Sequence, residues 1–446
     1  MTAPETGGTA SLWHDRRFNR FWAGQSISEL GDRITELALP LIAVTALNAS
    51  ANQVAWLTAL IWTPHLLAFL LGAWVDRRAH QRRLMVLADL VRGSVLLTLP
   101  AAYLLDAVSL GQLYAVAVLT GAAAVLFNTA YPPFFVRLVP RSAYIEANSR
   151  LSASRSVSHV IGPAVGGGLV HTLTAPVAVI ADALSYLASA FLIGRIPLDE
   201  PPTAGAGTGA GGTTDPSLLR RAREGMTLIG RNPVLRAGLC CAATVNFFTF
   251  AAGSGLMVLF ATRDLDLSPG AIGLALGTGA TGAFLGAVLA PKISRHIGVG
   301  RSIMVGAVLF PAPIAIAAVA HGPLWARAGA LAAAEFLSGV GVMLFDINLN
   351  SLRTSVIPDG MRSRVAGAFS TLNYGIRPIG AITGGLLATA FGLRATLLIS
   401  ATGGMLSLLW LLASPIPRIH SLTPDDTATP HTTQDTTDPD PYPAPS

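Results

Sequence analysis

The sequence predicts an all-α polytopic membrane protein with twelve transmembrane helices in two pseudo-symmetric six-helix bundles. Apolar runs of about 20 residues recur along the chain, and each is long enough to cross a bilayer core as a helix. Only 12% of the residues are charged and 52% are hydrophobic, whereas about 25% of a typical soluble protein is charged. A long segment also occurs twice, which divides the chain into two equivalent halves.

The repeat pairs residues 138–170 with residues 356–388 at a constant offset of 218. Within it, Gly166–Gly167 matches Gly384–Gly385. The same register continues upstream without a gap, which a chance similarity between two Gly-rich segments does not explain. We therefore interpret the chain as a duplicated half, and this duplication governs the prediction of the fold.

Six spans are expected on each side of a Pro-, Gly- and Thr-rich stretch at 201–216, whose composition is typical of a flexible linker. The expected spans are 20–46, 53–75, 84–105, 111–136, 144–170, 176–195, 234–261, 269–291, 301–320, 328–352, 364–389 and 395–414. The predicted organisation is a disordered cytoplasmic N-terminus (1–17), an N-terminal bundle (18–196), a cytoplasmic linker (197–231), a C-terminal bundle (232–416) and a disordered cytoplasmic tail (417–446).

The basic residues predict the orientation in the membrane. Most of the 30 Lys and Arg residues lie at one side of the expected spans, and only Arg263, Arg327 and Arg394 lie at the other. Because basic loops stay in the cytoplasm, both termini are expected there. This distribution also accounts for the net charge of +6 without a nucleic-acid partner.

Several functional classes find no support in the sequence. Cys240 and Cys241 are adjacent within an apolar run, so they indicate neither a disulfide framework nor a metal site. No phosphate-binding loop of the GxxxxGK[ST] type is present, so ATP is not the expected energy source. No nucleophile–base pair emerges, so we do not expect an enzyme. The expected partners are a small-molecule substrate and the lipid bilayer, and a monomer without a cofactor is predicted.

The first span carries four charged residues in ISELGDRITELALPLI: Glu29, Asp32, Arg33 and Glu36. Each charge near the centre of a membrane helix costs about 2.5–3.5 kcal/mol on insertion scales. This face must therefore line the protein interior or a water-filled cavity. Burial away from water favours the neutral form of a carboxyl group, as proton coupling requires.

Two interpretations of this face remain open. In the first, Asp32 is the primary proton carrier and Glu36 the next, while Arg33 neutralises Glu29 or Glu36. In the second, the four residues form a fixed ion-pair network around Arg33 that holds helices together. Both interpretations place the residues in the interior, and they can share residues.

Other polar residues within the spans are candidates for a substrate cavity, because unpaired polar groups are costly in hydrocarbon and mark functional sites. These residues are Asn128, Asp182, Asn246, Glu335, Asp346, Asn373 and Arg377.

The second span is followed by GAWVDRRAHQRR, which begins at Gly72 and contains Asp76 and Arg77. This loop resembles the GxxxDRxxRR signature of the major facilitator superfamily, although its second basic pair falls late. The resemblance implies a latch that closes the cytoplasmic side, and Asp89 and Arg92 are expected as partners of this loop. The alternative is that the basic residues only anchor the loop to anionic lipid.

The fifth span contains GPAVGGG, with Gly162, Pro163, Gly166 and Gly167. It resembles the GPxxGG antiporter motif of drug exporters in the same superfamily. Small residues in membrane helices allow backbones to approach closely, and Pro permits bending. Ordinary small-residue packing is the alternative, because the second copy, GAITGG, lacks the Pro.

The resemblance covers roughly residues 18–416. FWAGQSISELGDRITELALPL, LADLVRG, LFNTAYPPFF and DALSYL are similar to the branch that contains macrolide-efflux permeases and enterobactin-exporter-like proteins. This implies the major facilitator fold in a bacterial inner membrane, and proton-driven export of a small amphipathic compound such as an antibiotic or siderophore. An importer or facilitator of a metabolite is the alternative, and a transport-inactive sensor is a third hypothesis.

Overall fold

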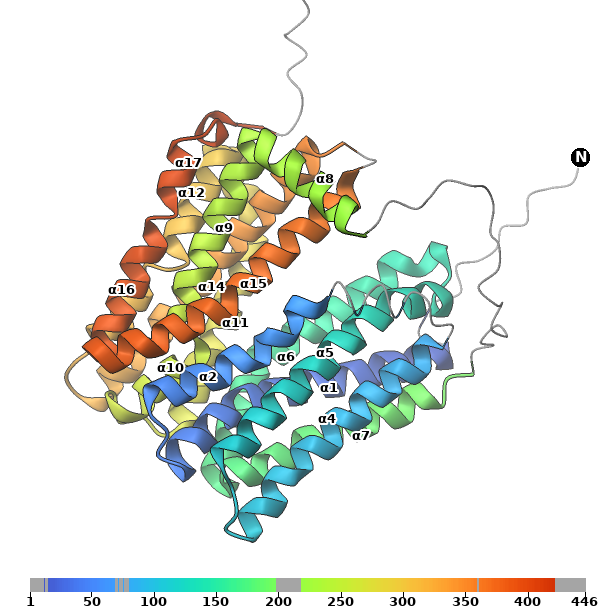
Figure 1. The fold of residues 1–446 in the computed structure, drawn as a ribbon, viewed down its shortest axis with the longest axis vertical. Coiled ribbons are helices and arrows are strands. Elements are labelled where there is room, and N and C mark those ends of the chain that lie inside the picture. Colours follow the sequence, from blue (N-terminus) through green and yellow to red (C-terminus); the bar gives the residue numbers. More distant parts are fainter. Residues whose placement is uncertain are drawn as a thin grey trace, which may run out of the picture.

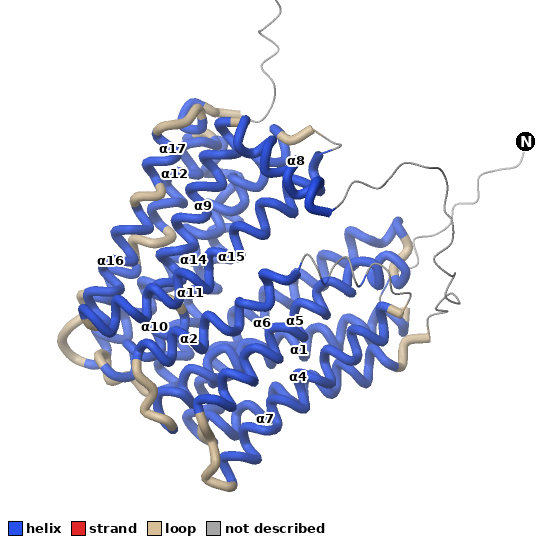
Figure 2. Tube along the Cα trace, viewed as in Figure 1, coloured by secondary structure: helices blue, strands red, loops and turns tan. Residues whose placement is uncertain are grey.

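The structure is a computed structural model that describes residues 12, 15–68, 71, 75, 80–197, 218–358 and 361–421. These residues form helices joined by short turns, and no strand occurs among them (Figure 2). The all-helical class predicted from the sequence is confirmed.

The helices before the linker form one group. Their bounds are α1 (Arg16–Leu41), η2 (Ile42–Ala46), α2 (Ala51–Trp62), η3 (Thr63–Leu67), α4 (Gln81–Leu104), α5 (Leu110–Leu138), η4 (Arg141–Ala143), α6 (Tyr144–Leu173) and α7 (Ala175–Gly194). Within this group, α1 packs against α6 and α7, and α4 packs against α5 and α7.

The remaining helices form a second group, and α8 lies in the last part of the predicted linker. Their bounds are α8 (Leu218–Arg231), α9 (Pro233–Ala252), α10 (Ser254–Arg263), α11 (Pro269–Ile297), α12 (Val299–Leu309), α13 (Ile314–Ala318), α14 (Leu324–Val356), α15 (Arg362–Phe391), α16 (Leu393–Met405), α17 (Leu408–Leu412) and η6 (Ile416–Arg418). Here α14 packs against α11 and α12, and α9 packs against α15 and α16.

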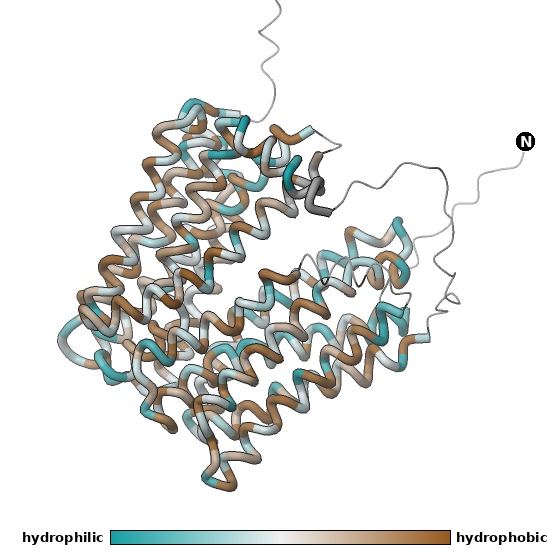
Figure 3. Tube along the Cα trace, viewed as in Figure 1, coloured by the Kyte–Doolittle hydropathy of each residue, from teal (hydrophilic) through white to brown (hydrophobic). Residues whose placement is uncertain are grey.

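Eight helical stretches among the described residues are long and apolar enough to cross a membrane. The other four predicted spans, 20–46, 53–75, 144–170 and 364–389, are also helical where the structure describes them. Hydrophobic residues run along the helices of both groups (Figure 3). The count of twelve spans stays a prediction, because charged residues within a helix such as α1 lower its mean hydropathy.

The two groups of helices meet at one end and diverge toward the end where α1 begins and α8 lies (Figure 1). Contacts between the groups are made chiefly by α6 with α11 and by α2 with α15. At the convergent end, the Arg263 guanidinium donates a hydrogen bond to the Ala49 carbonyl oxygen at 3.0 Å. The groups are therefore joined along two helix pairs and along one rim.

The turns at the convergent end reproduce the repeat found in the sequence. Asn48 has a φ of 49° and Asp266, at the offset of 218, has a φ of 50°. Two residues later, Ser50 and Ser268 each cap the following helix, accepting a hydrogen bond from a backbone N–H three residues on. Short polar residues tolerate this left-handed conformation and Ser is a favoured helix cap. The duplication thus extends to the first turn of each half.

The contacts between the halves follow the same symmetry. A Cβ added to Gly167 in α6 would approach the Gly273 Cα atom in α11 to 2.9 Å. A Cβ added to Gly385 in α15 would approach the Asn52 Cα atom in α2 to 3.1 Å, with Ala55 also in contact. The offset of 218 relates Gly167 to Gly385 and Ala55 to Gly273. Small residues therefore let both helix pairs pack backbone to backbone.

We predict that Gly167→Ala destabilises the protein and that Gly168→Ala does not. The added methyl group at Gly167 must push α6 away from α11, and overpacking of this kind costs about 1–3 kcal/mol. A Cβ at Gly168 meets nothing within 4 Å, so this neighbour is a matched control. Thermal unfolding of the two purified variants in one detergent measures the difference. Equal melting temperatures would contradict the packing at Gly167.

Candidate functional site

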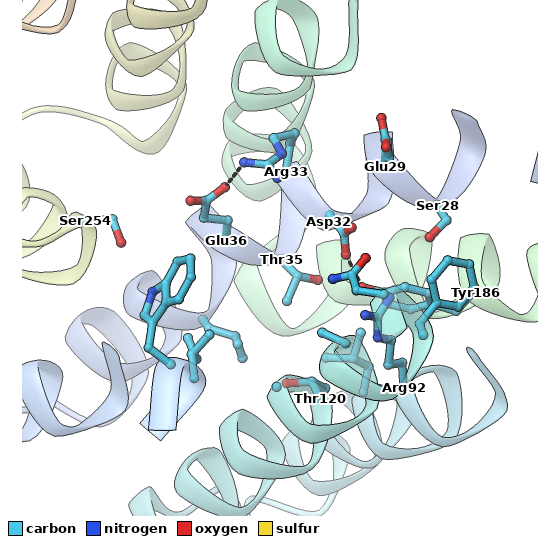
Figure 4. Close-up of a pocket in the computed structure, with 18 of the residues that line it drawn as sticks. Ser28, Glu29, Asp32, Arg33, Thr35, Glu36, Arg92, Thr120, Tyr186 and Ser254 are labelled. Carbon is cyan, nitrogen blue, oxygen red and sulfur yellow. Dashed lines mark hydrogen bonds and ion pairs between the residues drawn. The ribbon is translucent and has the colours of Figure 1, made fainter. Parts of the chain in front are cut away.

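The charged face of α1 lines a cavity of about 610 Å³. The cavity is enclosed mainly by α1, α2, α4 and α5, with side chains from α6, α7 and α10. Glu29, Asp32, Arg33 and Glu36 all contribute to its wall (Figure 4). The four charged residues that the sequence predicts at an interior or cavity-facing surface therefore lie together at a cavity.

Asp32 points toward α7, where its carboxylate accepts a hydrogen bond from the Tyr186 hydroxyl (Figure 4). Tyr186 is 5% exposed, so it holds Asp32 from the buried side of the wall. The Arg92 guanidinium of α4 lies 5.0 Å from the centre of the Tyr186 ring and 5.6 Å from that of Phe127. Asp32 therefore sits between the cavity and a buried polar layer.

The other three charged residues on this face of α1 are paired. Arg33 donates a hydrogen bond to the Glu36 carboxylate, one turn along the same helix. Arg155 of α6 donates to a Glu29 carboxylate oxygen at 3.0 Å. Of the two partners that the sequence leaves open for Arg33, the structure selects Glu36. Two carboxylates are thus neutralised by arginines, whereas Asp32 accepts its hydrogen bond from a neutral hydroxyl.

A second polar layer lies behind this wall. Asp89 of α4 is completely buried, and its carboxylate lies 3.9 Å from the guanidinium of Arg92. Asp182 of α7 is also completely buried, where it accepts a hydrogen bond from the Ser185 hydroxyl at 3.1 Å. α7 packs closely on α1 here, since a Cβ added to Gly31 would collide with the Asp182 carboxylate and with Ser185.

Asp182 therefore differs from its predicted position, because it lies behind the cavity wall. It lines neither this cavity nor the second cavity described below. Arg92, predicted as a partner of the loop at Asp76, contributes to the wall of the first cavity. The loop residues Gly72, Asp76 and Arg77 lie outside the described residues, so the latch of Asp76, Asp89 and Arg92 stays a prediction.

A second cavity of about 460 Å³ lies between the two halves. Arg33, Glu36, His159 and Ser254 line both cavities. The Arg33–Glu36 pair therefore stands where the two spaces meet. Glu335 of α14 is the acidic residue that the C-terminal half contributes to the second cavity, so this predicted residue does reach a cavity.

Arg377 of α15 lies within a box of aromatic rings. Its guanidinium carbon is 4.4 Å from the ring centre of Tyr374, 4.5 Å from that of Trp62 and 4.8 Å from that of Phe250. Trp62 belongs to α2 and lines the first cavity, whereas the other two rings belong to the C-terminal half. Cation–π contacts thus join the halves beside the cavity.

The remaining predicted residues occupy several positions. Asn128 lines the first cavity. The Asn246 amide of α9 donates a hydrogen bond to the Asn373 amide of α15 at 3.0 Å, which links two helices of the C-terminal half. Asp346 is exposed on α14, and neither it nor the Asn246–Asn373 pair lines the two larger cavities.

The antiporter-motif residues of α6 have distinct neighbours. Gly162 and Gly166 lie against Arg33 and Ile34 of α1, and Gly167 lies against α11. Pro163 lines the second cavity. The motif thus packs one helix simultaneously against the charged span of its own half and against the opposite half.

Sequence reasoning missed Tyr186, Trp62 and His65 as cavity residues. Aromatic residues in an apolar span are ordinary core residues, and only the rotation of their helices makes these three face a cavity. His159, which the offset of 218 relates to Arg377, also lines both cavities.

We predict that Arg92→Met lowers the free energy of unfolding by about 3–5 kcal/mol, the usual cost of removing one member of a buried ion pair. The cost arises because Asp89, completely buried, loses its cation. The double variant Arg92→Met/Asp89→Leu should recover part of this loss. Thermal unfolding in detergent measures both, and a double variant no more stable than Arg92→Met would contradict the pairing.

The sequence and the fold both have relatives among known proteins. A sequence model described as the Major Facilitator Superfamily matches residues 21–381 and 239–436. The chain is 28% identical to the multidrug efflux pump Tap of Mycolicibacterium fortuitum over 403 residues, covering 88% of this chain and 93% of that protein. It is 24% identical to Tap of Mycobacterium tuberculosis over 389 residues, covering 82% and 86%.

Solved structures share the fold at low sequence identity. A bacterial homologue of the iron transporter ferroportin in an inward-facing state has a TM-score of 0.70 at 17% identity, covering 90% of this chain and 98% of that one. In an outward-facing state the TM-score is 0.56, also at 17% identity, covering 89% and 98%. The nucleoside transporter NupG has a TM-score of 0.72 at 11% identity, covering 89% and 98%.

Of these two ferroportin-homologue structures, the inward-facing one has the higher TM-score. The duplicated helical halves, the cavities between them and the family match across most of the chain agree with one another. The chain belongs to the Major Facilitator Superfamily of membrane transporters.

Proposed function

We propose that this protein is a proton-coupled efflux transporter that works by alternating access. It exports a small amphipathic compound, such as an antibiotic or a siderophore, from the cytoplasm of a bacterium. Protons that enter down their gradient drive the export, so that no bound cofactor is needed. The protein acts as a monomer in the inner membrane, with both termini in the cytoplasm.

The charged face of α1 at the cavity is the observation that carries this proposal. Charges are expensive within a membrane and are kept there when they serve transport. Glu36 is 54% exposed although it lies within a membrane helix, so its carboxylate faces the cavity space. Carboxylates in this position can exchange protons with water in the cavity when the cavity opens to either side of the membrane.

Asp32 is the proposed proton carrier. Glu29 and Glu36 are each bound by an arginine, whereas Asp32 accepts a hydrogen bond from a neutral hydroxyl. The Tyr186 hydroxyl can donate to a charged Asp32 carboxylate and can accept from a protonated one. Its hydrogen bond therefore survives in both protonation states, and the fold can hold Asp32 through a transport cycle.

The direction of transport is supported by the relatives. The two Tap proteins are named multidrug efflux pumps and align with this chain over more than four fifths of its length. Export also fits a cavity lined by apolar and charged residues together, because an amphipathic compound presents both kinds of surface. The antiporter-like motif of α6 lies at the contact between the halves, where the packing must change when the transporter changes conformation.

We predict that Asp32→Asn abolishes export driven by a pH gradient, with a loss of at least tenfold in initial rate. The amide cannot bind or release a proton near neutral pH, but it keeps the hydrogen bond with Tyr186. Purified protein in liposomes, an imposed pH gradient and a panel of antibiotics and siderophores provide the measurement. Asp266→Asn is the matched control, since this acid lies at the loop and is 74% exposed.

Full-rate export by Asp32→Asn would overturn the assignment of the proton carrier. Solute flux in the wild-type protein that is indifferent to the pH gradient would overturn proton coupling itself. Accumulation on the side opposite to the one predicted for export would identify an importer or facilitator instead.

A further inference from the structure

We infer that the second cavity binds the positively charged group of a lipophilic monocation, with Glu335 as its counter-ion. This inference names the substrate class of the proposed transporter and rests on that proposed function. The cavity has three properties that point to such a ligand: an unpaired carboxylate, a charge balance of one negative charge, and a mostly apolar wall.

Glu335 projects from the middle of α14, where α14 packs against α11. A Cβ added to Gly279 of α11 would lie 3.3 Å from a Glu335 carboxylate oxygen. The absence of a side chain at Gly279 thus leaves room for the carboxylate to reach the cavity. Among the described residues, Glu335 forms no ion pair with a basic side chain and no side-chain hydrogen bond, although buried charges are normally paired.

The charge balance of the cavity leaves Glu335 uncompensated. The charged residues in its wall are Arg33, Glu36 and Glu335, together with His159. Arg33 and Glu36 pair with each other, so their charges cancel. When Glu335 is ionised and His159 is neutral, one negative charge remains, and a single positive charge on a ligand would neutralise it. A second acid would be needed to favour a dication, and an anion would be repelled.

The rest of the wall favours an apolar body. Apart from these four residues and three hydroxyl side chains, the lining consists of Gly, Ala, Pro, Val, Leu, Ile, Phe and Met side chains. Met257 of α10 and Met343 of α14 both belong to this lining, and their flexible, polarisable side chains can adapt to ligands of different shape. A volume of about 460 Å³ lies within the usual range for small-molecule sites.

The physical argument joins these properties. A hydrated metal ion or a small ammonium ion would have to give up its hydration shell to enter this apolar cavity, where one carboxylate would be its only charged partner. The desolvation cost would then exceed the electrostatic gain. A cation whose charge is shielded by hydrocarbon groups loses little hydration and gains both apolar burial and the Glu335 charge. The cavity therefore favours lipophilic cations over neutral compounds, anions and small hydrophilic ions.

Tetraphenylphosphonium is a permanent monocation with an apolar body, so it tests this inference directly. Its binding to the purified protein in detergent is measured by equilibrium dialysis for the wild type, Glu335→Gln and Glu335→Asp. We expect the wild type to bind it, Glu335→Gln to bind it at least tenfold more weakly, and Glu335→Asp to retain most of the affinity. Asp266→Asn is the control for removal of a carboxylate elsewhere, and size-exclusion profiles confirm that the variants remain folded.

Equal affinity in the wild type and Glu335→Gln, or no binding by the wild type, would overturn the inference. Triphenylphosphine oxide, an uncharged compound with three phenyl rings, should not displace the bound cation, and efficient displacement would also count against it. Export measured in liposomes separates the two claims. Export without Glu335-dependent cation binding overturns this inference alone, whereas Glu335-dependent binding without export overturns the efflux function alone.

Discussion

The cost of placing charge in hydrocarbon is the constraint on which this structure depends. Four charged residues in α1 would be intolerable at a lipid-facing surface, so α1 must lie inside, against α6 and α7, with its charged face at a cavity. The pairing of Arg33 with Glu36 and of Arg155 with Glu29 lowers that cost without filling the cavity. The arrangement of the N-terminal half follows from it: α7 must supply Tyr186 to Asp32, and α4 must supply a cation to the polar layer behind.

Small residues hold the two bundles together, because they let helices from opposite halves pack closely along a narrow contact. Membrane helices associate through close packing rather than through a hydrophobic driving force. The Gly167–Gly273 contact and its counterpart at Gly385 and Ala55 meet this need at repeat-related positions. Arg377, enclosed by aromatic rings from both halves, adds an electrostatic contact to the α2–α15 pair.

The sequence predicted the helical class, the repeat and the acidic wall, because each is a property of residue type and spacing. The offset of 218 reappears in the Asn48 and Asp266 turns and in the glycine contacts. The fate of Asp182 and Asp346 could not be predicted, because hydropathy places a residue along a helix but not around it. Asp182 faces α1, whereas Asp346 lies on α14 outside the linings of both cavities, and no pattern in an apolar helix distinguishes these rotations. The choice of Glu36 over Glu29 by Arg33 depended on Arg155, which lies 126 residues away from Glu29.

The two halves have kept a common backbone while their chemistry has separated. Arg155, which holds Glu29, corresponds in the repeat to Asn373, which holds Asn246 through neutral amides. An amide pair keeps its helices in register at every pH, whereas an ion pair responds to its surroundings. At these repeat-related positions, the ionic contact lies in the N-terminal copy and the neutral contact lies in the C-terminal copy. After a gene duplication, the two copies can therefore diverge in the chemistry of this contact while they keep the backbone that they share.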